Sequence, residues 1–212
     1  MNKINYQKEL DKLIESLKRE DIVPSLLLHS CCAPCSSYTI EYLSQYFKIS
    51  VLYYNPNISP IEEYEKRKAE QIRLINEMET ANPICIIDCD YNYSDFEEIA
   101  KGYEDCREGG ERCFRCYELR LRKTAITAKE NAFDYFCTTL SISPLKNSQK
   151  INEIGFMLQD ELGVKWLPSD FKKKEGYKRS IDLSRQYNLY RQNFCGCVYS
   201  KHKTTATEEN DE

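Results

Sequence analysis

Several common sequence signals are absent from this chain of 212 residues. It has no Gly-x-Gly-x-x-Gly and no Gly-x-x-x-x-Gly-Lys motif, so neither a dinucleotide-binding turn nor a P-loop is predicted. No apolar run approaches the roughly 18 residues of a membrane helix. Residues 1–20 are charged throughout, unlike a signal peptide. With no internal repeat or linker visible, the sequence predicts a cytoplasmic protein of one domain that does not engage a membrane.

Cysteine is the residue that the chain has in excess, with 11 in 212 positions. Hydrophobic residues make up 41% and charged residues 30%, which indicates a soluble globular protein. Because the cytosol is reducing, a framework of structural disulfides is not expected. The thiols therefore favour metal binding or redox catalysis, and eleven unrelated buried thiols are the alternative.

Alternating apolar segments and amphipathic segments predict an α/β fold, with a parallel sheet flanked by helices and right-handed crossovers. Strands are expected near residues 25–29, 49–54, 84–88, 135–140 and 164–167. Helices are expected at 3–20, from the first strand's turn to about 46, and at 59–78, 95–103, 114–131, 148–162 and 179–190. Residues 1–203 form the predicted single domain, and the acidic tail 204–212 is expected to be disordered.

The most informative segment is His29-Ser-Cys-Cys-Ala-Pro-Cys35, which follows the apolar run 25–28. In an open α/β sheet, the turn after a strand lies at the edge where ligands bind. Here it carries three thiols and a proline instead of glycines that cradle phosphate. It also lacks the Ser-Gly-Gly-x-Asp-Ser loop that an ATP-pyrophosphatase has at this place. The turn thus predicts metal or redox chemistry, while His29 itself is expected to be a hydrogen-bonded strand residue.

A second set of thiols has the spacing of metal ligands. Two residues separate Cys113 from Cys116, which lets both thiolates reach one metal or cluster. With Cys31 and Cys32 they predict a four-thiolate centre, either tetrahedral zinc or an iron–sulfur cluster. Side chains of adjacent cysteines tend to diverge, which makes one small zinc ion an unfavourable partner for both. A larger cluster, or two neighbouring metals with one thiol each, is favoured instead. Cys35 and Cys106 are then candidate ligands of a second site, or simply packed or solvent-facing thiols.

Cys195-Gly196-Cys197 forms a third set. The spacing is tight for two ligands of one tetrahedral site. One interpretation is a pair that cycles between dithiol and strained disulfide, since strained disulfides are readily reduced. The other is two packed cysteines on either side of a turn. Cys85, Cys89 and Cys137 lie on or beside apolar strands and are expected to be core thiols.

Positive charge is concentrated near the C-terminus, although the net charge of the chain is −4. Residues 172–203 contain nine basic and two acidic residues, a net charge of +7. A local basic face is what contacts with nucleic-acid phosphates require. A solvated helix face is the alternative interpretation of the same residues.

Seven segments, in order between about residues 25 and 200, together resemble the QueH family of epoxyqueuosine reductases. They are His29–Cys35, Tyr54-Asn-Pro-Asn-Ile58, Glu108-Gly-Gly-Glu-Arg-Cys-Phe-Arg-Cys-Tyr117, Thr138-Thr-Leu140 with Ser143-Pro-Leu-Lys146, Lys173-Lys-Glu-Gly-Tyr177 and Tyr190-Arg-Gln-Asn-Phe-Cys-Gly-Cys197. The resemblance implies a fold similar to the ATP-pyrophosphatase (HUP-like) type without use of ATP. It also implies reduction of epoxyqueuosine to queuosine at the tRNA wobble position, a two-electron removal of the epoxide oxygen.

The same resemblance assigns roles to the cysteines. It implies that Cys31, Cys32, Cys113 and Cys116 hold a [4Fe–4S] cluster and that Cys195 and Cys197 form a redox-active disulfide. Position 35 is Cys or Asp in the family, so Cys35 is a candidate ligand of a second, mononuclear iron.

The expected partners are a tRNA that carries epoxyqueuosine and a low-potential electron donor of the ferredoxin or flavodoxin kind. The expected substrate-binding residues are Lys146, Lys173, Lys174, Tyr177 and Arg179, and Lys172 and Lys178 are expected to touch tRNA with them. Two alternatives remain at this point. One is an iron–sulfur tRNA sulfur-transfer enzyme, which needs ATP, and the other is a zinc-stabilised RNA-binding module without catalysis.

Overall fold

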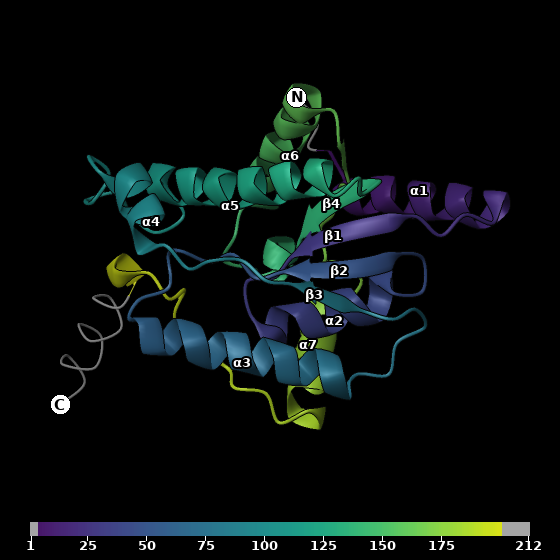
Figure 1. The fold of residues 1–212 in the computed structure, drawn as a ribbon, viewed down its shortest axis with the longest axis horizontal. Coiled ribbons are helices and arrows are strands. Elements are labelled where there is room, and N and C mark those ends of the chain that lie inside the picture. Colours follow the sequence, from purple (N-terminus) through teal and green to yellow (C-terminus); the bar gives the residue numbers. More distant parts are fainter. Residues whose placement is uncertain (1–3, 201–212) are drawn as a thin grey trace.

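A computed structural model describes residues 4–200 and shows five parallel strands in the order β3-β2-β1-β4-β5 (Figure 1). The strands are β1 (Ser25–His29), β2 (Lys48–Leu52), β3 (Cys85–Ile87), β4 (Tyr135–Thr138) and β5 (Lys165–Trp166). Leu26 of the central strand β1 pairs with Ile49 on one side and with Tyr135 on the other. The three consecutive leucines of β1 are fully buried. The predicted parallel α/β sheet is therefore confirmed, with its apolar run at the centre.

Helices cover both faces of the sheet (Figure 1). One face carries α2 (Ala33–Leu43) and α3 (Ile61–Glu77), with α7 (Gly176–Gln186) packed on α2. The other carries α4 (Tyr93–Ala100), α5 (Glu111–Glu130) and α6 (Ser148–Leu162). The leading helix α1 (Tyr6–Glu20) touches both layers: the Tyr6 ring lies 6.2 Å from that of Phe156 on α6, and Asp11 accepts a hydrogen bond from Tyr42 of α2. Among helices within residues 4–200, none is long and apolar enough to cross a membrane.

Predicted and observed bounds differ by a few residues at several elements, and two of these differences have a visible structural cause. The fourth strand was expected to reach residue 140, but it ends at Thr138, whose side chain accepts from the Leu140 amide and starts the 3-10 turn η1 (Thr139–Ile142). The last helix was expected at 179–190 and instead begins at Gly176. A Cβ at this glycine would lie 2.0 Å from the Phe171 carbonyl oxygen, so only glycine permits the tight entry. The helix ends before Asn188, whose φ of 46° is left-handed.

The three cysteines expected in the core have different surroundings. Cys137 on β4 is fully buried, as predicted. Cys89 is partly buried and its thiol donates to the Tyr53 carbonyl oxygen at 3.1 Å. Cys85 is exposed, so its assignment to the core is wrong: it opens β3, a three-residue strand at the edge of the sheet.

His29 is a hydrogen-bonded strand residue, as expected. Its Nε2 lies 3.0 Å from the Tyr54 carbonyl oxygen, to which it must donate, and its Nδ1 lies 2.8 Å from the Thr138 hydroxyl. The Thr138 oxygen already accepts from a backbone amide, so its proton is available to Nδ1. Burial lowers the pKa of His29 to about 4, and the ring is therefore neutral at physiological pH.

The strand order places a crevice beside His29. The chain moves from β1 to β2 and β3 in one direction, and then crosses to β4 and β5 on the opposite side. The connections that leave β1 and β4 consequently diverge at their carboxyl ends. This reversal is the position at which open α/β sheets bind ligands.

Candidate active site

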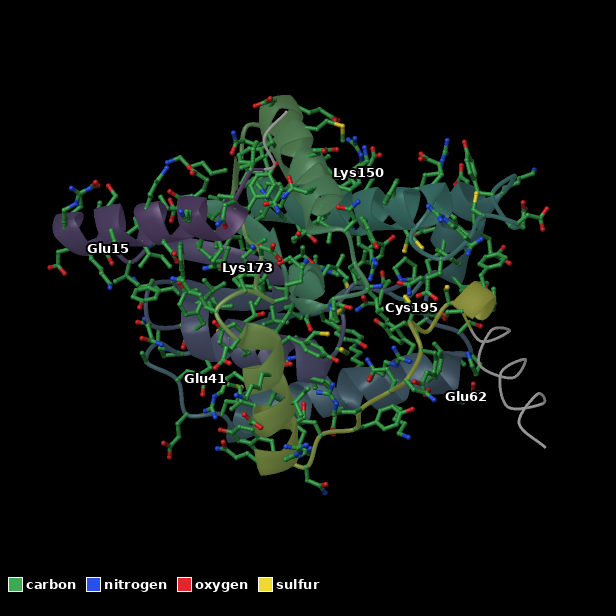
Figure 2. The ribbon with its side chains drawn as sticks, turned by 180° about the vertical axis from the view of Figure 1, so that it is seen from behind. Glu15, Glu41, Glu62, Lys150, Lys173 and Cys195 are labelled. Atoms are coloured by element: carbon green, nitrogen blue, oxygen red, sulfur yellow. The ribbon has the colours of Figure 1, made fainter. Side chains whose placement is uncertain are left out.

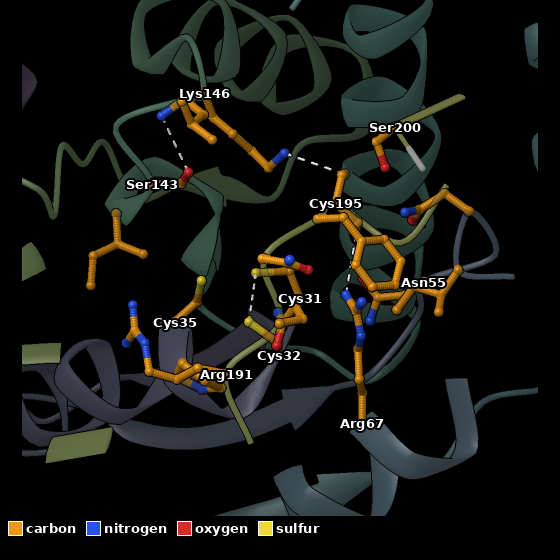
Figure 3. Close-up of a pocket in the computed structure, with 18 of the residues that line it drawn as sticks. Cys31, Cys32, Cys35, Asn55, Arg67, Ser143, Lys146, Arg191, Cys195 and Ser200 are labelled. Atoms are coloured by element: carbon orange, nitrogen blue, oxygen red, sulfur yellow. Dashed lines mark hydrogen bonds between the residues drawn. The ribbon is translucent and has the colours of Figure 1, made fainter. Parts of the chain in front are cut away.

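A cavity of about 460 Å³ lies at the carboxyl ends of β1 and β4, within the size range of small-molecule sites. Three segments that are far apart in the sequence provide most of its lining. They are the thiol turn 31–35 after β1, residues 142–146 after η1, and the C-terminal segment 191–195 (Figure 3). The sheet topology thus brings together three of the motifs singled out from the sequence.

The three thiols of the turn converge. The sulfurs of Cys31, Cys32 and Cys35 all lie within 4.8 Å of one another, and no other group of three or more potential metal ligands in residues 4–200 is this compact. The adjacent pair was expected to diverge, yet Cys31 Sγ and Cys32 Sγ are 3.9 Å apart (Figure 3). Convergence is possible because Cys32 is the extended N-cap of α2, so the chain turns between strand and helix at this point. The positive end of the α2 dipole also favours thiolate there.

A network of buried hydrogen bonds supports the backbone and the flanking serine side chains of the thiol turn. The hydroxyls of Ser30 and Ser36 both donate to Gln71 Oε1 of α3, at 2.6 and 2.7 Å. Asn55 Nδ2 donates to the Ser30 carbonyl oxygen at 2.8 Å. All four residues are buried. This support could not be predicted from the sequence, because its members come from three separate parts of the chain: the residues beside the thiol turn, the segment after β2, and α3.

The thiol turn favours one negative charge among its sulfurs. Hydrogen bonds from the Cys32 and Cys35 thiols, and from the Thr139 hydroxyl at 3.3 Å, hold the pKa of Cys31 well below its ordinary value. The same bonds raise the pKa of Cys32 to about 12 and raise that of Cys35. A metal or cluster binds thiolates, so binding at this turn would displace further protons.

Cys113 and Cys116 lie in the first turns of α5, outside the compact group. The Gly109 amide donates to Cys113 Sγ at 3.2 Å. Cys116 is buried in a small apolar cluster with Phe96 and Cys197. Cys106 is partly buried and also lies outside the compact group.

Arg120 connects α5 to the cavity. Its Nε donates to the Cys116 carbonyl oxygen at 3.2 Å, and its Nη1 donates to Asn55 Oδ1 at 3.4 Å. Only 2% of the residue is exposed, and Nη2 has no hydrogen-bond partner within residues 4–200. Asn57 Oδ1, also on the cavity wall, is likewise unpartnered there. Because a buried unsatisfied polar atom costs about 1–3 kcal/mol, both atoms point to a bound group that satisfies them.

Cys195 faces the cavity between two cations. Lys146 Nζ donates to Cys195 Sγ at 3.5 Å, and Arg67 Nη1 donates to the Cys195 carbonyl oxygen at 3.2 Å (Figure 3). A hydrogen bond from Cys197, together with the charges of Lys146 and Arg120, holds the pKa of Cys195 well below its ordinary value. The same hydrogen bond and burial raise the pKa of Cys197.

Gly196 permits this arrangement. Its φ is +106°, and a Cβ there would lie 3.1 Å from both Arg67 Nη1 and Ile58 Cγ1. The Gly196 carbonyl oxygen also accepts from the Ser59 amide at 3.0 Å. A side chain at this position would therefore strain the backbone and push the dithiol away from α3.

The expected substrate-binding residues fall into two places. Lys146 and Tyr177 line the cavity. Lys173 lies on the loop before α7 (Figure 2) and is not among the residues that line the cavity. Lys174 forms an ion pair with Asp11 at 2.7 Å, and Arg179 forms one with Glu41 at 2.6 Å, so these two side chains are directed to α1 and α2.

Comparison with known proteins shows extensive similarity. The sequence model of the family described as "Epoxyqueuosine reductase QueH" matches residues 26–203. The protein of that name from Staphylococcus epidermidis is 45% identical over 205 residues, which cover 95% of this chain and 86% of the relative. The one from Streptococcus pyogenes serotype M1 is 44% identical over 200 residues, covering 93% and 78%.

A solved structure is similar in fold. It is the U34-tRNA thiolase NcsA from Methanococcus maripaludis with its [4Fe-4S] cluster, at a TM-score of 0.52 and 12% identity, covering 96% of this chain and 72% of that one. At this identity the likeness concerns the fold alone. It confirms the predicted α/β architecture.

Proposed function

The chain belongs to the QueH family of epoxyqueuosine reductases, and from this premise we propose that its reaction takes place in the cavity at the carboxyl ends of β1 and β4. The reaction converts epoxyqueuosine to queuosine in tRNA. The observation that carries the proposal is the convergence of the thiol turn, Lys146 and Cys195 on one cavity. Removing an epoxide oxygen to leave an alkene consumes two electrons and two protons and releases water, so the site must supply both.

The thiols fit an iron–sulfur cluster. In this proposal Cys31, Cys32, Cys113 and Cys116 are its ligands, because thiolates are the ligands that such clusters take. The closeness of the Cys31 and Cys32 sulfurs supports the assignment, as does the unpartnered guanidinium nitrogen of Arg120, which can donate to a sulfide or thiolate. When bound, the cluster supplies electrons one at a time. Cys35 is the remaining thiol of the compact group and the proposed ligand of a second, mononuclear iron.

Cys195 and Cys197 are the proposed redox-active dithiol. As a dithiol the pair stores two electrons and two protons, and it releases them when one S–S bond forms. The position of Cys195 on the cavity wall supports this role. Lys146 brings a further proton-bearing group to the same wall.

The substrate is proposed to enter as a base unstacked from a single-stranded tRNA loop. Tyr177 on the cavity wall is suited to stack on it, and Lys173, Lys174 and Arg179 lie on or beside the loop before α7, where tRNA phosphates are proposed to bind. A low-potential protein of the ferredoxin or flavodoxin kind is the proposed electron donor.

Metal analysis of protein purified without oxygen tests the cofactor. We expect a brown protein with about four irons and matching sulfide, bleached by dithionite, and additional iron if Cys35 holds a second ion. The same preparation should reduce epoxyqueuosine in tRNA without added ATP. Stoichiometric zinc without iron or sulfide would contradict the proposed centre.

A further inference from the structure

The two cysteines of the dithiol have different surroundings. Cys195 lines the cavity, and its sulfur contacts an ammonium group. Cys197 is 8% exposed and packs with Phe96, Ala100 and Cys116 behind the cavity wall. A molecule that enters the cavity therefore meets the sulfur of Cys195 and not that of Cys197.

Lys146 is held in place for its contact with Cys195. Its amide donates to the Ser143 carbonyl oxygen at 3.2 Å, and its Nζ lies 5.8 Å from the centre of the Tyr117 ring. Across residues 4–200 no carboxylate forms an ion pair with Lys146, so the sulfur of Cys195 is the acceptor that its ammonium contacts. An ammonium at hydrogen-bond distance favours the thiolate, which is the nucleophilic form of cysteine.

We propose that Lys146 is a positioning residue that keeps Cys195 as the reactive thiolate of the pair, with Cys197 as the resolving thiol. The inference rests on the proposed dithiol and deepens it by giving the order in which the two sulfurs react. Because Cys195 is already a thiolate, oxidation of the pair forms one S–S bond and releases two electrons and the single S–H proton of Cys197, while the second proton is held by the Lys146 ammonium beside Cys195. These are the two electrons and two protons that an epoxide needs to become an alkene and water.

The other charged and titratable groups around Cys195 come from three parts of the chain. Arg120, Cys116 and Tyr117 belong to α5, and Cys197 follows along the chain. Arg67 of α3 binds the carbonyl oxygen of Cys195 and pairs with Glu63 at 2.6 Å. Lys146 alone donates a hydrogen bond from an ammonium to the sulfur, so its removal should change the reactivity of Cys195 selectively.

Pulse alkylation of the anaerobic, metal-loaded protein tests the order. After short exposure to iodoacetamide at pH 7, peptide mass spectrometry should show Cys195 modified at least about tenfold faster than Cys197, because only the thiolate attacks. Lys146→Met should slow modification of Cys195 about tenfold and move its pH profile upward, and Lys146→Arg should restore most of the rate. Lys150→Met removes a half-exposed lysine that pairs with Glu153 on α6, and should leave both rates unchanged.

Two outcomes would overturn the inference. One is a wild-type protein in which Cys197 reacts as fast as Cys195, a measurement that requires no variant. The other is a Lys146→Met protein with unchanged iron content and an unchanged pH profile of Cys195 alkylation. Failure of the proposed dithiol is recognised separately, because mild oxidation with diamide would then yield no Cys195–Cys197 disulfide while the difference in alkylation persists.

Discussion

The fold treats the cations of the C-terminal basic segment and two cations of the cavity, Arg120 and Lys146, in opposite ways, whereas Arg67, which also lines the cavity, pairs with Glu63. On the loop before α7 and on α7 itself, most basic side chains have a carboxylate partner: Lys172 with Asp170, Lys174 with Asp11, Lys178 with Glu175, and Arg179 with Glu41. In the cavity, Arg120 and Lys146 form no ion pair with any carboxylate of residues 4–200. A charge count along the sequence therefore overstates the first group and overlooks the second.

The difference has an energetic meaning. Exposed ion pairs contribute about 0–1 kcal/mol each, so the pairs on α7 do little more than fix side-chain positions. A buried cation without a partner costs several kcal/mol unless an anion compensates it. Arg120 is 2% exposed and its Nη2 has no hydrogen-bond partner within residues 4–200, so its burial is compensated only when a negative group lies beside it. The negative groups on the lining of this cavity are Glu108 and the thiolates, with whatever the thiolates bind.

The largest effects are expected when the thiolates that compensate the cavity cations are removed. Cys31→Ala and Cys32→Ala each delete a proposed cluster ligand that faces the cavity cations. We expect loss of bound iron and a fall in epoxyqueuosine reduction of more than about 100-fold, beyond the 10–100-fold effect of losing an outer-shell partner. Cys85→Ala removes an exposed thiol of β3 and should change neither quantity. Full iron content in the Cys31 or Cys32 variants would contradict their role as ligands.

His29 extends the comparison between paired and unpaired cations to a third case, a buried basic side chain that is neutral at physiological pH. Its folded pKa of about 4 lies below the unfolded value of about 6.5, so the native state binds fewer protons. The stability from neutral His29 is full above about pH 6.5 and is lost as the pH falls toward 4, a change of about 3 kcal/mol. Urea denaturation of the wild type and of His29→Gln at pH 7 and pH 4.5 measures it. Equal pH dependence in the two proteins would be inconsistent with this account.

Two arginines of α5 allow a cavity cation and an ion-paired surface cation to be compared within one helix. Arg120→Met should weaken iron retention about 10–100-fold, the usual effect of losing a group that supports the ligands. Arg122→Met removes a half-exposed arginine that pairs with Glu118 and Glu161, and should cost at most about 1 kcal/mol of stability without loss of iron. Iron released by increasing concentrations of a chelator gives the measurement. Identical release curves for both variants would show that Arg120 does not serve the centre.

The smallest effects are expected on the basic segment. Lys173 has no carboxylate partner in the described part of the chain, whereas Arg179 shares its charge with Glu41. Lys173→Ala should reduce the slope of log affinity for tRNA against log salt by about 0.7–0.9, and Arg179→Ala should reduce it less. If replacing Lys172, Lys173, Lys174, Lys178 and Arg179 together left tRNA affinity and its salt dependence unchanged, the proposed phosphate contacts would be wrong.

Much of the fold followed from local patterns in the sequence. The leucines of β1 and the helix 148–162 were predicted because apolar periodicity and capping are local signals. The early start of α7 was missed because it depends on the approach of Gly176 to Phe171. The thiol turn was also predicted from sequence, since a strand and three cysteines stand side by side.

The environment of the thiols could not be predicted in the same way. Gln71 binds Ser30 and Ser36 on either side of the thiol turn from α3, and Arg120 reaches the cavity from α5. The ion pairs of Lys174 and Arg179 likewise join residues that are over 100 positions apart. Contacts of this kind depend on the strand order, which local patterns do not specify. The one signal in the sequence that could have identified Arg120 is its position one helical turn after the candidate ligand Cys116.

Of the three segments that provide most of the cavity lining, the segment 191–195 is synthesised last. About 160 residues separate Cys35 from Cys195, which at about 5–20 residues per second is roughly 8 to 32 s of synthesis. During that interval the thiol turn exists, and later β4 and Lys146, while the segment 191–195 does not. Until that segment is made, the cavity lacks one of the three segments that provide most of its lining. The order of the motifs along the chain therefore sets the order in which the segments that line the cavity are synthesised.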